Sequence, residues 1–170
     1  GETVPQVWLR GSSDYSGALA AQLGLRFAFA HFINAQGGDA VTRAYQAQYR
    51  PSAREPQPQT LVCTFAICAD SDAEAERLAA SIDLRRLHMA LNLDTTVPTL
   101  DEALRHEYSD EERRYVIGQR SRAVIGGLAK CRREIEAMAE RYAADEVMLL
   151  TITGDYASRL RSYELLAEML

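Results

Sequence analysis

A loop rich in hydroxyl groups, GSSDYSG at residues 11–17, has the residue types best suited to binding a ligand. Ser12, Ser13 and Ser16 offer hydroxyl donors, and Gly11 leaves room for a close approach. A helical pattern follows this loop, so its backbone N–H groups would gather at the positive end of a helix dipole, which suits a phosphate. The same residues equally suit a helix N-cap that binds nothing, and Asp14 would repel an anion. Residue types alone leave both interpretations open.

Other candidate residues have less specific patterns. His31 ends an apolar run and could face a ligand there, although a lone histidine among Phe and Ala is more often packed and hydrogen-bonded. Arg10 lies inside an otherwise apolar strand and is either a phosphate ligand or a surface charge. GSSDY has Tyr15 where a nucleophile elbow needs glycine, so we do not expect a serine hydrolase. The catalytic residues are not identified by these patterns.

A metal site is not expected. The three histidines are scattered, and Cys63, Cys68 and Cys131 lack metal-ligand spacing. The acidic run DSDAEAE from residue 70 has Ala75 where a calcium loop needs glycine and Ser81 where it needs glutamate. Helix capping explains that run better, and the odd set of cysteines suits buried thiols in a reducing compartment.

Composition limits the class of protein. The chain has 170 residues, 47% hydrophobic and 25% charged, as expected for one globular domain over residues 1–170. A net charge of -5 and a pI near 5.3 exclude a nucleic-acid surface, which needs clustered Lys and Arg. No apolar run has the length of a membrane span, and no leader pattern is visible. We therefore expect a cytoplasmic protein.

The elements that must position these residues alternate between strands and helices. Apolar runs predict four strands, at residues 5–11, 25–33, 60–68 and 146–153. Helical periods follow each of them, including a long helix over residues 70–91 and a clear one over 128–142, whereas residues 92–127 predict one or two short helices. Ser71 with Glu74 and Ser109 with Glu112 predict capping boxes. Strands that each precede a helix form a parallel sheet, and ligands bind at the carboxyl ends of such strands.

Three stretches together resemble a known family: residues 7–33 (VWLRGSSDYSGALAAQLGLRFAFAHFI), 77–91 (RLAASIDLRRLHMAL) and 134–170, which contain RLRSYELLAE. From about Pro5 to the last residue, the chain resembles the C-terminal half of the bacterial luciferase-like, flavin-dependent monooxygenases. The resemblance implies an α/β fold that is the last half of a (β/α)8 barrel, with four parallel βα units and extra helices before the last strand.

The resemblance also implies a site and a reaction. The family holds the FMN phosphate on the loop after the fifth strand, and Gly11, Ser12, Ser13 and Ser16 fall on that loop, so the resemblance favours the phosphate over the plain cap. His31, from its place at the end of the second strand, could face the flavin ring or the substrate. Reduced FMN, supplied by a reductase, would react with oxygen to give a flavin hydroperoxide that oxygenates a small organic substrate. The alternative is a non-catalytic flavin-binding or assembly module.

A half barrel would leave part of its sheet uncovered. We expect apolar residues such as Met148, Leu150 and Ile152 to face water in a lone chain, at a cost of roughly 25 cal/mol per Å². The expected relief is a homo-oligomer or a separate N-terminal half. The chain alone is expected to be inactive, because half of the flavin pocket is missing.

Overall fold

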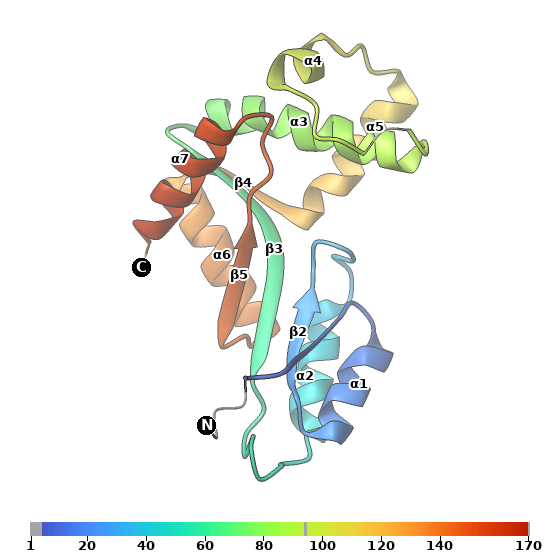
Figure 1. The fold of residues 1–170 in the computed structure, drawn as a ribbon, viewed down its shortest axis with the longest axis vertical. Helices are drawn as coiled ribbons and strands as arrows, with labels where there is room; N and C mark the ends of the chain where they lie inside the picture. Colours follow the sequence, from blue (N-terminus) through green and yellow to red (C-terminus); the bar gives the residue numbers. More distant parts are fainter. Residues whose placement is uncertain (1–4, 94, 170) are drawn as a thin grey trace. The chain divides into compact units, whose positions relative to one another are not determined.

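The computed structural model describes residues 5–93 and 95–169, in which strands and helices alternate along the chain (Figure 1). In chain order the elements are β1 (Trp8–Gly11), α1 (Asp14–Leu23), β2 (Arg26–Ala30), α2 (Gly38–Gln48), β3 (Thr60–Ala69), α3 (Asp72–Ala90), α4 (Leu100–Arg105), α5 (Asp110–Gln119), the 3-10 turn η1 (Arg120–Arg122), β4 (Ala123–Gly127), α6 (Leu128–Tyr142), β5 (Glu146–Leu150) and α7 (Tyr156–Ala167).

The sheet is parallel, as predicted, in the pairings of β1 with β2, β2 with β3 and β3 with β4. β5 also pairs with β3. The ten residues of β3 pair with β2 over residues 60–63 and with β4 over residues 65–69. All but one of its residues are buried, as expected for a strand that is apolar at nearly every position.

One strand was not predicted. Residues 123–127 (AVIGG) form β4, where the sequence pattern predicted only short helices between residues 92 and 127. The strand ends at Gly126 and Gly127. A Cβ on Gly126 would lie 2.6 Å from Lys130 Cδ, and the N–H of Gly127 donates to Asp72 Oδ1 at 2.6 Å. The glycines therefore let the start of α3 approach the strand closely.

Backbone contacts divide the chain into two compact units. Unit 1 holds residues 1–64 and 136–148, and unit 2 holds residues 65–135 and 149–170. The expectation of one domain over residues 1–170 stays a prediction.

Unit 1 has an aromatic core on one face of its strands. Phe27 and Phe29 alternate along β2 and are fully buried. Their rings contact Tyr45 of α2, at 5.3 Å between centroids, and Tyr142 at the end of α6, at 5.6 Å. Figure 1 shows α1 and α2 beside β2. Each such buried side chain contributes roughly 1.5–3 kcal/mol.

Unit 2 has its core between α3 and the strand pair β3–β4. The core cluster is aliphatic and comprises Ile67, Ala69, Ala75, Leu78, Ala79, Ile82 and Ile125. A second cluster joins α3 to α4 and comprises Leu84, Leu87 and Ala103.

Helix ends follow the local sequence. Gly24 ends α1 in the left-handed region with φ of 60°, where its N–H donates to the carbonyls of the last turn. The predicted capping box of Ser109 with Glu112 is confirmed. Ser71 caps α3, where its side chain accepts from the N–H of Glu74. The reciprocal bond of the predicted capping box, from the N–H of Ser71 to the Glu74 side chain, does not form. The Glu74 carboxylate instead accepts from Arg77 at 2.8 Å.

Candidate functional site

The hydroxyl-rich loop lies at the carboxyl end of β1 and the start of α1, where the sequence places it. Gly11 ends the strand, and a Cβ there would lie 2.1 Å from Ser16 Oγ and 2.2 Å from Ser16 Cβ. Only glycine at position 11 therefore lets the Ser16 side chain fold back over the strand end. The structure thus brings together Gly11, Ser13 and Ser16, which are three of the predicted phosphate ligands.

Ser13 and Ser16 form a reciprocal cap on α1. The N–H of Ser16 donates to Ser13 Oγ at 3.4 Å, and the N–H of Ser13 donates to Ser16 Oγ at 3.3 Å. The Ser16 hydroxyl donates to the Ser13 carbonyl at 2.7 Å. Three of the four contacts between these residues, including the 3.3 Å hydroxyl pair, are long. Long hydrogen bonds are weak, so the Ser13 hydroxyl can exchange partners more readily than the Ser16 hydroxyl, which also makes the 2.7 Å bond.

Asp14 Oδ1 accepts from the N–H of Tyr15 at 2.9 Å. This donor is neutral, so the carboxylate keeps its negative charge in the first turn of α1. The N–H of Asp14 is at the first position of α1 and has no acceptor within the helix. Asn34, in the loop after β2, donates from Nδ2 to the Ser12 carbonyl at 3.4 Å. The loops after β1 and β2 therefore meet at one edge of the sheet of unit 1.

His31 is the fifth predicted site residue and is buried at the end of β2. It is 2% exposed, and its Nδ1 lies 2.7 Å from the Tyr142 hydroxyl. The two rings are perpendicular, with centroids 5.6 Å apart. Burial raises the pKa of Tyr142 above its usual value. This packed arrangement is the second possibility that the sequence offered, and contact with a flavin stays a prediction.

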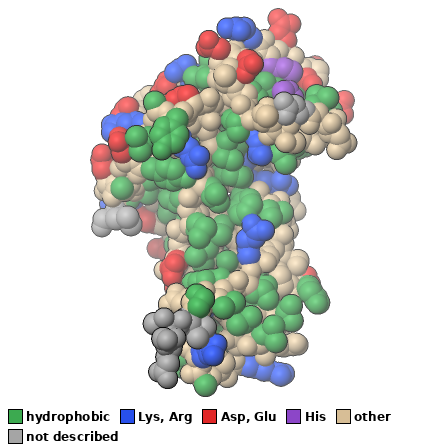
Figure 2. Space-filling model, in the orientation of Figure 1, with side chains coloured by type: hydrophobic (Ala, Val, Ile, Leu, Met, Phe, Trp, Pro, Cys, Tyr) green, Lys and Arg blue, Asp and Glu red, His purple; other side chains and the backbone are tan. Residues whose placement is uncertain are grey.

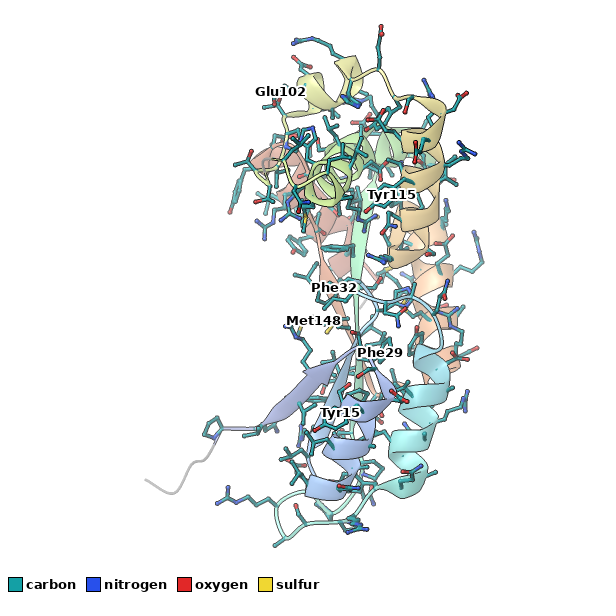
Figure 3. All side chains as sticks on the ribbon, turned by 90° about the vertical axis from the view of Figure 1, so that its right-hand side faces the viewer. Tyr15, Phe29, Phe32, Glu102, Tyr115 and Met148 are labelled. Atoms are coloured by element: carbon teal, nitrogen blue, oxygen red, sulfur yellow. The ribbon has the colours of Figure 1, made fainter. Side chains whose placement is uncertain are left out.

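The face of unit 1 opposite the aromatic core has a different character. Ala28, Leu61 and Cys63 form a small cluster, packed against Trp8 and Phe32. Figure 3 shows Phe29 on the helix side of the strands and Met148 on the opposite side. Cys63 Sγ lies 3.9 Å from Met148 Sδ. In Figure 2, hydrophobic side chains gather over the strands of this unit.

The expected exposure of β5 is confirmed in part. Met148 is 49% exposed and Leu150 is 36% exposed, although Ile152 is only partly exposed. β5 ends at Leu150, three residues earlier than its apolar run predicted.

In unit 2, the polar residues at strand ends form structural pairings. Asp70, after β3, accepts from Arg161 of α7 at 2.6 Å, which lowers the pKa of this carboxyl. Asp155, after β5, caps α7 by accepting from the N–H of Ser158 at 2.8 Å, which likewise lowers its pKa. Their membership of one rim with the loop at residues 11–16 stays a prediction.

A buried charged cluster in unit 2 escaped the sequence analysis. Asp83 Oδ2 lies 2.5 Å from Arg120 Nη2, and Asp83 Oδ1 and Arg86 Nη2 are buried without a hydrogen bond. Burial raises the pKa of Asp83, although the charge of Arg120 opposes this, and burial lowers the pKa of Arg86. Asp83 and Arg86 lie one turn apart in the helix sequence DLRRL at residues 83–87. Charged residues in such a run usually face solvent, so the sequence gives no local signal that these two are buried.

Two surface pockets lie within single units. One of about 290 Å³ lies between α1 and α2, lined by Asp14, Ala18, Ala40, Val41, Ala44, Tyr45 and Gln48. One of about 330 Å³ in unit 2 is lined by Glu76, Val116, Ile117, Arg120, Ala123, Ile125, Lys130 and Glu134.

Within residues 5–93 and 95–169, no group of His, Cys, Asp and Glu could hold a metal ion. No helix in the same ranges is long and apolar enough to cross a membrane.

Comparison with known proteins gives consistent relatives. No family model matches the chain. YwcH, an uncharacterised protein of Bacillus subtilis, is 36% identical over 168 residues, which cover 98% of this chain and 50% of the relative. A luciferase-like monooxygenase of Escherichia coli K12 is also 36% identical, over 97% of this chain and 49% of the relative. The chain thus spans about half the length of the curated relatives that it matches.

Solved structures agree with these relatives. The crystal structure of apo-MsnO8 has a TM-score of 0.90 and 31% identity, covering 99% of this chain and 52% of that one. The FMN complex of the oxygenating constituent of 3,6-diketocamphane monooxygenase from Pseudomonas putida has a TM-score of 0.64. At 16% identity, that second likeness shows the fold alone. The predicted fold class, an α/β half of a (β/α)8 barrel, is confirmed by the element order and by these half-length matches. The chain is therefore related to the luciferase-like monooxygenases and corresponds to about half of one of them.

Proposed function

We propose that this chain is the C-terminal half of an FMN-dependent monooxygenase and binds the FMN phosphate at Gly11, Ser12, Ser13 and Ser16. The observation that carries the proposal is the loop at the start of α1, where Gly11 and the hydroxyls of Ser13 and Ser16 meet at the end of β1. The sequence likeness to a luciferase-like monooxygenase over nearly the whole chain supports it.

The donor chemistry of the loop fits a phosphate. The hydroxyls of Ser13 and Ser16 and the N–H of Asp14 lie at the positive end of a ten-residue helix. The Ser13 hydroxyl makes only long bonds, whereas the Ser16 hydroxyl also donates to the Ser13 carbonyl at 2.7 Å. The one carboxylate in the first turn, that of Asp14, accepts from the N–H of Tyr15 but keeps its charge, so it opposes the bound phosphate and lowers the affinity. Ser12, Ser13 and Ser16 would donate to the phosphate oxygens, and Gly11 would keep Ser16 at the strand end.

Bound reduced flavin supplies the reactivity toward oxygen that a monooxygenase needs. The chain's own contribution is to bind and orient that group. His31 and Tyr142 hold the end of β2 in place next to the phosphate loop through their 2.7 Å contact. We propose that the substrate is a small organic molecule, and that a reductase supplies the reduced flavin.

The phosphate assignment is tested by comparing FMN with riboflavin, which lacks the phosphate. The double substitution Ser13→Ala and Ser16→Ala should weaken FMN binding by about 1–3 kcal/mol, because charge-assisted hydrogen bonds are lost. Riboflavin binding should not change. Binding is measured by quenching of flavin fluorescence.

The matched control is Ser109→Ala, which removes a capping hydroxyl of the same kind from α5 in unit 2. This variant should lose helix stability without losing FMN affinity. Equal losses for FMN and riboflavin in the Ser13→Ala, Ser16→Ala variant would contradict the phosphate site.

A second candidate function is a non-catalytic flavin-binding or assembly module. The exposure of Met148 and Leu150, which suits an assembly surface, favours it. In either case we propose that a second copy or a separate N-terminal half covers these residues, and that the 170-residue chain alone does not oxygenate a substrate. Oxygenated product from the isolated chain and a flavin reductase would contradict this. A stable 18.9 kDa monomer in light scattering would contradict the partner.

A further inference from the structure

Arg10 is the one charged residue of β1, and the proposed phosphate site does not account for it. The strand reads WLRG, and Arg10 is its exposed member. Arg10 lies opposite Ala28 in the register of β1 with β2, and Ala28 lies opposite Leu61 of β3. Across the three strands, the long cationic side chain of Arg10 is therefore followed by the small side chain of Ala28 and the apolar side chain of Leu61.

The guanidinium of Arg10 reaches the carboxyl edge of the sheet. Its Cζ lies 6.0 Å from the centroid of the Phe32 ring, and Phe32 follows the end of β2 by two residues. The charge of Arg10 also acts on Cys63, where it opposes the rise in thiol pKa that burial causes. Arg10 thus lies on the apolar face formed by Ala28, Cys63 and Phe32, one residue before the loop that begins at Gly11.

No acidic side chain among residues 5–93 and 95–169 forms a salt bridge with Arg10. The contrast is Arg26, whose guanidinium lies 5.5 Å from the Trp8 ring. Arg26 Nε is 2.9 Å from Glu55 Oε1, so its charge is paired. With no carboxylate partner among the described residues, the exposed guanidinium of Arg10 is open to an anionic ligand.

The isoalloxazine ring of a flavin changes charge with its oxidation state. The oxidised ring is neutral, whereas the two-electron-reduced ring loses the proton at N1 near neutral pH and becomes an anion. A cation near the ring therefore stabilises the reduced form more than the oxidised form. The phosphate is the same in both forms, so a cation that contacts only the phosphate has no such preference.

We propose that Arg10 makes this site select reduced over oxidised flavin. The inference rests on the proposed flavin site and adds a specificity-determining residue to it. An enzyme that takes reduced flavin from a reductase benefits from such a preference, because oxidised flavin then competes less. Phe32 keeps the guanidinium at the sheet edge through the contact of its ring with the cation.

The test compares the affinity of the 170-residue chain for oxidised and reduced FMN. Both titrations are done without oxygen, with the reduced form made by photoreduction. Arg10→Met should weaken the binding of reduced FMN by roughly tenfold and leave the binding of oxidised FMN within about twofold, since a nearby opposite charge shifts a pKa by about one unit or more and one unit corresponds to tenfold. By linkage, a tenfold loss of affinity for the reduced form alone lowers the two-electron potential of the bound flavin by about 30 mV relative to the unaltered chain.

Two further variants sharpen the result. Arg10→Lys keeps the charge and should retain the preference. Arg54→Met removes an exposed arginine from the same unit and should change neither affinity. Equal weakening of both oxidation states by Arg10→Met would overturn this inference and leave the phosphate site standing. If the unaltered chain binds neither form of FMN, the proposed function fails and this inference fails with it.

Discussion

Substitution of Gly11 by alanine tests whether the loop is built as the structure shows. The added Cβ would lie 2.1 Å from Ser16 Oγ and 2.2 Å from Ser16 Cβ, whereas the Ser16 Cα is 3.7 Å away. The side chain of Ser16 must therefore move, and its bonds to Ser13 break with it. The backbone of Gly11 is not in the left-handed region, so steric contact alone carries the cost.

The expected cost follows from these contacts. Forcing a methyl group into a filled site costs about 1–3 kcal/mol, and losing an N-cap costs about 1 kcal/mol. Restricting the unfolded chain returns about 0.4–1 kcal/mol. We expect Gly11→Ala to lower the free energy of unfolding by about 2–3 kcal/mol.

A double-mutant cycle identifies Ser16 as the cause. Ser16→Gly removes both atoms that would clash, so Gly11→Ala should cost less than about 1 kcal/mol in that background. Stability is measured by urea denaturation followed by far-UV circular dichroism. Gly118→Ala is the control, because a Cβ at Gly118 in α5 meets nothing within 4 Å and should stabilise the helix. An equal cost of Gly11→Ala with and without Ser16→Gly would refute the reasoning.

Three other outcomes follow from buried groups. Tyr142→Phe should lower the free energy of unfolding by about 1–3 kcal/mol, because His31 Nδ1 loses its 2.7 Å partner, and an unchanged urea midpoint would contradict that contact. Arg120→Met and Asp83→Asn should each destabilise the chain by about 3 kcal/mol, since the first removes the ion-pair partner of buried Asp83 and the second removes the carboxylate whose charge acts on buried Arg86; an unchanged urea midpoint for either variant would contradict the cluster. Burial raises the pKa of Cys131 from 9.0 to about 12, so stability present below pH 9 should be lost as pH rises toward 12, and Cys131→Ala should flatten this loss in urea midpoints measured across that range.

Local patterns predicted the helices well because caps and periodicity act over a few residues. Gly24 ends α1 and Ser109 with Glu112 starts α5, as their types require. α6 spans Leu128–Tyr142, the range that its apolar period predicted. The strand β4 was missed because Val124 and Ile125 are too short a run to separate strand from helix. Its pairing with β3 is a contact between distant residues, which no local pattern encodes.

The candidate site divides in the same way. Ser13 and Ser16, which contact each other, are three residues apart in the sequence, so the pattern of hydroxyl residues predicted the place of this contact. The contact of His31 with Tyr142 spans 111 residues, so the sequence could offer packing only as an alternative for His31. Arg10 stood out as a charge in an apolar strand, but its approach to Phe32 depends on the pairing of β1 with β2.

The cap and the phosphate site are compatible uses of one loop, but they compete for the same groups. A phosphate that binds Ser13 and Ser16 must replace their bonds to each other and to the N–H groups of α1, so each new bond gains less than one made by a free hydroxyl. The 2.7 Å bond from Ser16 to the Ser13 carbonyl is the strongest of these and the least easily exchanged. At the proposed site, the loop would therefore position the phosphate more than it would add to the affinity for it. On the proposed flavin site, affinity would come largely from contacts with the ring, so the apolar face with Arg10 and Phe32 would matter as much as the hydroxyls.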